Sequence, residues 1–132
     1  MRLILTALLF VGGLFFTIYG LSFLLWPQSI APGFGLTPDG PLGWATVRAD
    51  LTAVFVTCGI CMMWGAWRRA GDVLLVPAML FGIALAGRIV SAVSDGTYDN
   101  FWLPMIIEAL VVVLSIAGNR LLPHHRVEEI TG

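Results

Sequence analysis

The sequence predicts an all-α integral membrane protein, an up-down bundle of four spanning helices with both termini in the cytoplasm. Three observations predict this class. Only 11% of the 132 residues are charged and 58% are hydrophobic, whereas soluble domains carry about 25% charged residues. The mean hydropathy is +0.92. Apolar runs recur four times along the chain, each near the length of about 20 residues that a helix needs to cross a bilayer.

The same composition excludes several other classes of protein. An ordinary soluble enzyme of this size would need more polar side chains to cover its surface. The high hydrophobicity excludes a disordered segment, and the formal charge of −1 with no lysine excludes a nucleic-acid binder. Two cysteines can form at most one disulfide, which is too few to stabilise a chain of this length and excludes a disulfide scaffold.

The expected spans lie at residues 3–26, 44–67, 73–94 and 101–122, within a single transmembrane domain, residues 1–132. Each run ends at a change of sequence character: at Pro27, at Arg68-Arg69, at Asp95-Gly96 and at Pro123. The connection 27–43 holds four of the seven prolines and is expected to lie along the outer interface. The tail, 123–132, is expected to be solvated and cytoplasmic.

The first apolar run has an alternative interpretation as a secretory signal peptide. Arg2 supplies a basic start, and Ser29-Ile30-Ala31 has the small residues of a cleavage site. The apolar stretch, however, is far longer than the roughly 7–15 residues of such signals. A retained helix is therefore the prediction.

Arginine placement predicts the orientation, because basic residues concentrate in cytoplasmic loops. With four spans, the N-terminus, the second loop and the C-terminus share one side of the membrane. That side holds Arg2, Arg68, Arg69, Arg120 and Arg126, and the opposite side holds Asp39, Asp95 and Asp99. Both termini are therefore expected in the cytoplasm.

Two charged residues lie deep within the predicted spans. Arg88 precedes Asp95, at the outer end of its helix, by seven residues, and Glu108 follows Phe101 by the same seven. Seven residues correspond to about 10 Å of helix, so the two side chains lie at matching depth in the outer third. Because an intramembrane charge is costly, an Arg88–Glu108 ion pair is expected.

Arg48, Asp50 and Asp95 lie in the same outer layer, so we expect a charged cluster of Arg48, Asp50, Arg88, Asp95 and Glu108. Arg48 and Asp50 are two residues apart, about 200° around a helix, and point in different directions. One interpretation is a buried ion-pair network that fixes helix register. The other is a polar pocket that binds a lipid headgroup, a small polar molecule or a proton.

Other motifs are weaker. Cys58-Gly-Ile-Cys61 has the spacing of thiol oxidoreductases, but no second cysteine pair exists to relay electrons, so packing is the preferred interpretation. His124-His125 lacks a third ligand nearby, and neither a metal nor a cofactor is expected. Small-residue faces on the first span (Gly13, Thr17, Gly20) and the third (Gly82, Ala86, Gly87) are typical of close helix packing.

The chain resembles the small four-span bacterial membrane proteins grouped as domain of unknown function 4345. The resemblance rests on Arg48, Gly87-Arg88, Asp95-Gly96 and Glu108, together with Trp26-Pro27 and Gly35-Leu36. That family's second helix carries Asn-Glu-x-Arg-Ala followed by an aromatic residue and two glycines. This chain has Ala45-Thr46-Val47-Arg48-Ala49-Asp50 there and lacks the glutamate. The resemblance implies a multi-pass protein of the bacterial inner membrane and assigns no activity.

Three hypotheses for function follow. The first is a small membrane protein whose charged pocket in the outer third binds a lipid headgroup or a small polar ligand. The second is an accessory or structural subunit of a larger membrane complex or homo-oligomer, in which the charges form a buried ion-pair network. The third is a membrane enzyme with Glu108 as acid/base. The bilayer is the expected partner in all three, and nucleic acid in none.

Overall fold

The computed structural model describes residues 1–122, and its regular structure there consists of helices. Four segments are long and apolar enough to span a membrane: Arg2–Leu25, Gly40–Arg68, Gly71–Ser94 and Trp102–Leu121. Large apolar side chains are exposed along all four, as a lipid surround permits. The predicted all-α, four-span membrane bundle is confirmed. The predicted tail, 123–132, with its His124-His125 pair, lies outside the described residues.

The long helices are α1 (Arg2–Leu25), α4 (Thr52–Arg68), α5 (Leu75–Ser94) and α6 (Trp102–Leu121). The second span is composite, because α3 (Gly40–Thr46) and a π-helical turn, η2 (Val47–Leu51), precede α4 without a break. It begins at Gly40, where a proline occupies the first turn and its missing N–H costs no hydrogen bond. This start lies four residues before the expected Trp44.

Helices α1 and α4 form a close antiparallel pair. A methyl group added at Gly13 would lie 2.6 Å from the Gly59 carbonyl oxygen, and one at Gly59 would lie 2.5 Å from the Gly13 carbonyl oxygen. Neither position has room for a side chain, so the two backbones touch directly. In lipid, burying apolar surface does not favour helix association, so helices associate through close van der Waals packing of this kind. The small-residue face predicted on α1 is thus a packing face.

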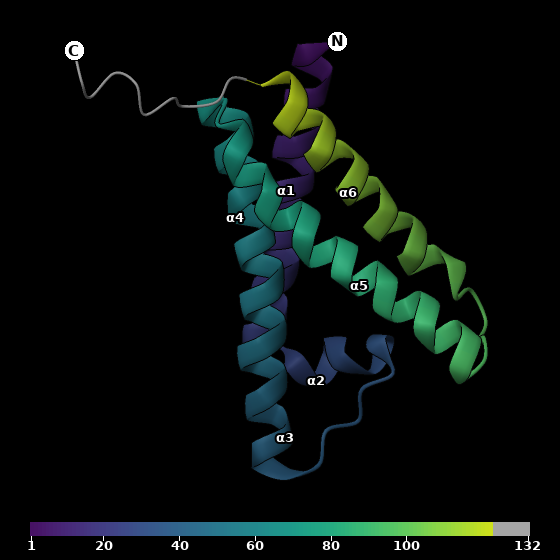
Figure 1. Cartoon of the computed structure of the whole chain (residues 1–132). Helices are drawn as coiled ribbons and strands as arrows, with labels where there is room; N and C mark the ends of the chain where they lie inside the picture. Colours follow the sequence, from purple (N-terminus) through teal and green to yellow (C-terminus); the bar gives the residue numbers. More distant parts are fainter. Residues whose placement is uncertain (123–132) are drawn as a thin grey trace, which may run out of the picture.

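Helices α5 and α6 form a second pair that meets the first at one end only (Figure 1). The junction is built around Leu74 of η3 (Gly71–Leu74), which is fully buried. A side chain at Gly118 would collide with Leu74 and with Leu9 of α1. The Asn119 side chain also donates to the Gly71 carbonyl over 2.9 Å. From this junction the α5–α6 pair diverges from the α1–α4 pair.

The connection between α1 and α3 turns into the opening between the two pairs. It forms α2 (Pro27–Ile30) and the 3-10 turn η1 (Ala31–Phe34), seen beside α4 in Figure 1. Buried Ala31 packs against Phe23 of α1 and Val47 of η2. Phe34 adds an edge contact to Phe23, with ring centroids 5.2 Å apart. These contacts hold α2 and η1 against the C-terminal part of α1 and the start of the second span.

The small-residue face predicted on α5 is only loosely packed within residues 1–122. No atom lies within 4 Å of a methyl group built at Gly87, and at Gly82 the nearest is 4.0 Å away. Ala86 is exposed. Within residues 1–122 this face therefore borders α6 only at Gly82, through Val112, and has no close neighbour at Gly87.

Candidate functional site

An ion pair joins α5 to α6 in the outer part of the α5–α6 pair. Arg88 Nε donates to Glu108 Oε1 over 2.7 Å, and the two side chains form a salt bridge. The side chains differ in exposure, at 34% for Arg88 and 7% for Glu108. The pair predicted from matched depth is therefore present, with the carboxylate inside and the guanidinium reaching outward.

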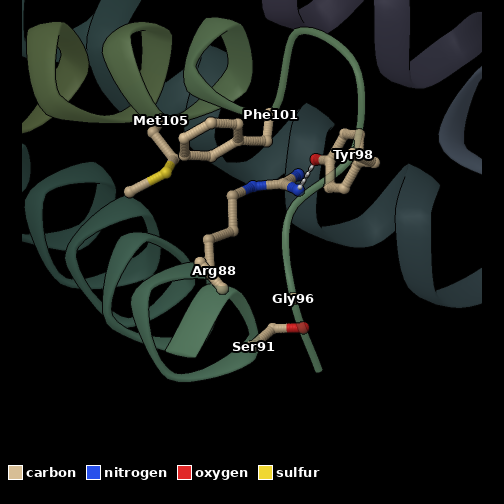
Figure 2. A pocket seen from close by; sticks show the side chains of 7 residues that line it. Arg88, Ser91, Gly96, Tyr98, Phe101 and Met105 are labelled. Carbon is tan, nitrogen blue, oxygen red and sulfur yellow. Dashed lines mark hydrogen bonds between the residues drawn. The ribbon is translucent and has the colours of Figure 1, made fainter. Parts of the chain in front are cut away.

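The guanidinium extends along its own helix toward the outer loop rather than lying flat in the core. Arg88 Nη1 is 3.4 Å from the hydroxyl of Tyr98, which lies between α5 and α6. Figure 2 shows Phe101 and Met105 beside the arginine side chain, with the guanidinium directed toward Tyr98. Arginine commonly extends its charge toward the interface while its stem stays among apolar groups. The charged end of Arg88 thus lies beside the loop between α5 and α6.

Arg88 borders a groove of ≈ 640 Å³ between the two helix pairs. One wall comes from α1 and η1 and the other from α5, α6 and the loop that joins them. The lining residues are Tyr19, Gly33, Phe34, Gly35, Arg88, Tyr98, Asp99, Asn100, Leu103, Pro104 and Ile107. A smaller cavity of ≈ 50 Å³ lies on the other side of the arginine, among Ser91, Phe101 and Met105. The size of the groove is within the usual range for small-molecule sites, about 300–1,000 Å³.

Glu108 positions the arginine. Its Oε1 holds the Nε edge of the guanidinium, which leaves the two terminal nitrogens for Tyr98 and for the groove. Its second oxygen, Oε2, is buried and accepts no hydrogen bond from the described residues. The buried Glu108 carboxylate therefore neutralises the positive charge of Arg88 and leaves part of the guanidinium exposed to the groove.

Arg48 belongs to a different contact. Its Nε donates to the carbonyl oxygen of Leu24 over 3.2 Å. Leu24 lies in the last turn of α1, where carbonyl groups have no partner in their own helix and carry partial negative charge. Arg48 therefore caps α1 from the π-helical turn of the second span.

Asp50 and Asp95 are also apart from the ion pair. Asp50 is exposed on η2, and Asp95 is exposed and accepts a 2.8 Å hydrogen bond from Ser91, four residues earlier. Within residues 1–122 no hydrogen bond or ion pair links Arg48, Asp50 or Asp95 to Arg88 or Glu108. Of the five expected residues, the structure brings two together.

Several groove residues were not predicted from the sequence. Tyr98, Asp99 and Asn100 belong to a loop too short to attract notice, and Tyr19 and Phe34 read as ordinary apolar positions. One feature of the sequence could have predicted the contact with Tyr98: this residue lies three positions beyond Asp95, at the end of the helix that carries Arg88. An arginine extending toward the surface from that helix would meet this loop first.

The two cysteines are free and lie within α4. Cys58 is fully buried, and its Sγ lies 3.8 Å from Met62 Sδ on the next turn of the same helix. Cys61 is half-buried. Cys58 belongs to the apolar core, as expected for a packing residue.

The chain matches the family model described as "Domain of unknown function (DUF4345)" over residues 4–118. This match covers nearly all of the chain, so the protein belongs to that family. The match includes Arg88, Glu108 and the whole lining of the groove.

A second comparison relates the chain to a much longer membrane protein. It is 31% identical over 87 residues to a K(+)-insensitive pyrophosphate-energized proton pump of Chloroflexus aurantiacus. The matched segment is 64% of this chain and 11% of the pump. No solved structure matches the chain.

Proposed function

We propose that this protein binds a membrane phospholipid in the groove between its two helix pairs, with the lipid phosphate at Arg88. The observation that carries the proposal is the half-exposed guanidinium, held on one edge by Glu108 and open to the groove on the other. Terminal guanidinium nitrogens are suited to phosphate oxygens, which they can contact in pairs.

The walls of the groove support an amphipathic ligand. Below the polar loop, Leu103, Pro104 and Ile107 of α6 provide an apolar surface that an acyl chain can follow. Tyr98, Asp99 and Asn100 surround the other end with polar groups. The groove therefore changes from polar to apolar in the same direction as a lipid in the outer leaflet. The surrounding bilayer supplies such a ligand at high concentration.

The test compares lipid retention by purified variants in native mass spectrometry from detergent. Arg88→Met with Glu108→Gln removes both charges, which avoids leaving one of them buried and unpaired. We expect this double variant to lose about tenfold in phospholipid affinity, the effect of one charge-assisted contact. Arg120→Gln, an exposed arginine in the last turn of α6, is the matched control and should bind normally. Equal retention by all three proteins would exclude the groove as the site.

We further propose that the protein resides in the bacterial inner membrane with both termini in the cytoplasm. The support is the one-sided distribution of arginine, since α1 begins and α6 ends at the same end of the molecule (Figure 1). In this orientation the groove opens to the outer leaflet.

A second candidate function is that of a subunit in a larger membrane assembly. The specific observation is the exposed small-residue surface of α5 at Ala86 and Gly87, which leaves room for another helix. The similarity of part of this chain to 11% of a long proton pump also supports this candidate. Native electrophoresis of solubilised membranes tests it: a defined complex that Gly87→Leu disperses would favour this function.

A further inference from the structure

The groove lining holds one base, Arg88, and one acid, Asp99, and the base already has a carboxylate partner behind the lining. Arg88 is neutralised by Glu108, which lies behind it. Asp99 is the acid among the lining residues, is exposed, and has no hydrogen bond or ion pair with any residue in the described part of the chain. Arg88 is the one base among the lining residues. With Arg88 and Glu108 compensating each other, a purely anionic headgroup would face the uncompensated Asp99 carboxylate.

The aromatic groups of the groove lining suit a cation. Tyr19, Phe34 and Tyr98 supply three aromatic rings to the groove wall. Aromatic faces attract ammonium groups, and they do so more strongly where water is excluded. An ammonium within the groove could contact these rings and the Asp99 carboxylate, while the terminal nitrogens of Arg88, which Glu108 does not bind, could contact a phosphate.

The positions of the two charges match the order of groups in a lipid headgroup. Arg88 extends from within α5 to Tyr98, and Asp99 follows Tyr98 directly in the loop. The base therefore comes from the membrane side and the acid lies in the outer connection. In a zwitterionic phospholipid the phosphate is attached to the acyl-bearing glycerol, and the amine lies beyond it.

We propose that the groove selects a zwitterionic phospholipid with a primary ammonium headgroup, phosphatidylethanolamine in class, whose phosphate contacts Arg88 and whose ammonium contacts Asp99. The inference rests on the proposed lipid-binding function and adds the identity of the headgroup. A primary ammonium is favoured over a trimethylated one because it can donate hydrogen bonds to the carboxylate.

The experiment measures competition between phosphatidylethanolamine and phosphatidylglycerol of identical acyl chains, by native mass spectrometry of the full chain. The wild type should prefer phosphatidylethanolamine by roughly 3- to 10-fold, the combined effect of one exposed ion pair and one cation–π contact. Asp99→Asn should reduce the preference to about 1, since it loses the ammonium partner and the repulsion of the anionic lipid together. Asp39→Asn makes the same charge change in the outer connection, away from the groove lining, and should keep the preference.

The outcomes separate this inference from the function on which it rests. Equal binding of both lipids by the wild type, with loss of both in Arg88→Met/Glu108→Gln, would overturn the headgroup assignment and retain lipid binding. Normal binding by that double variant would overturn both. Loss of preference in Asp39→Asn as well would attribute selectivity to general surface charge and overturn the role of Asp99. Glycerophosphoethanolamine, which has the headgroup without acyl chains, should not compete at equal concentration, and competition would assign the groove to a free headgroup compound.

Discussion

At the scale of single residues, the two edges of the Arg88 guanidinium make different contacts. Arg88 Nε is committed to Glu108, while Nη1 reaches the Tyr98 hydroxyl and the terminal end faces the groove. A lone charge in the hydrocarbon costs at least about 2.5–3.5 kcal/mol on insertion scales. The carboxylate offsets that cost from inside the protein and keeps the arginine in place for a ligand.

A double-mutant cycle on Arg88→Met and Glu108→Gln tests this coupling. Each single change strands a charge or a buried polar group, and breaking a buried pair from one side costs about 3–5 kcal/mol. Because Arg88 is half-exposed, we expect losses at the lower end. The double variant should be more stable than the sum of the single losses implies, by about 0.5–3 kcal/mol. Thermal unfolding of the four proteins in detergent measures it, and additive losses would show that the residues do not act as a pair.

The thiols provide a second prediction at this scale. Cys58→Ala and Cys61→Ala should leave lipid binding unchanged, because neither cysteine lines the groove. We expect a packing loss at the fully buried Cys58 of about 1 kcal/mol and a smaller one at Cys61. Binding assays and unfolding curves on the same samples check both. Loss of binding at unchanged stability would point to a redox role for Cys58 and Cys61.

At the scale of helices, the same small-residue pattern has two outcomes. On α1 it meets Gly59 of α4 at backbone contact distance, whereas on α5 no atom of the described residues lies within 4 Å of a methyl group at Gly87. The sequence predicts the four helices well, because length and apolarity alone decide what can cross a bilayer. It does not predict which faces pair, since that depends on residues such as Gly59 that carry no signal of their own.

Glycine substitutions separate the two outcomes. Gly59→Leu should destabilise the protein by about 1–3 kcal/mol or more, because overpacking forces α1 and α4 apart. Gly87→Leu is the matched control on α5, with no atom within 4 Å of the added carbon. We expect it to be neutral or to stabilise by up to about 1 kcal/mol through helix propensity. Unfolding in detergent provides the comparison, and equal losses would argue against the close α1–α4 contact.

At the scale of the whole molecule, the opening between two helix pairs creates the groove. The sequence predicts the Arg88–Glu108 pair from equal depth, but it predicts a single five-residue cluster where the structure has three separate contacts. The depth of a residue in the membrane follows from the number of residues between it and the end of its helix. The neighbouring helix that its side chain faces depends on the crossing angles of the helices, which the sequence does not give. The aromatic lining and Asp99 come together only through that geometry.

Membrane topology is a prediction at this scale. A reporter fused after Gly132 should be active in the cytoplasm, and one inserted near Asp39 should be active outside, because the arginines gather on the side of the termini. A control fusion after Arg69, in the second loop, should behave like the C-terminal one. Reporters after Gly132 and near Asp39 that are active on the same side would contradict the four-span arrangement.

The most direct test of the central claim is a diffraction structure of the protein crystallised from a lipidic mesophase doped with phosphatidylethanolamine. Lipid binding in the groove predicts a phosphate within about 3 Å of the Arg88 guanidinium, the distance of a charge-assisted hydrogen bond. It also predicts an acyl chain along Leu103 and Ile107, with Glu108 still paired to Arg88. A groove closed by packing of α5 and α6 onto α1, or lipid density confined to the outer faces of the helices, would contradict it.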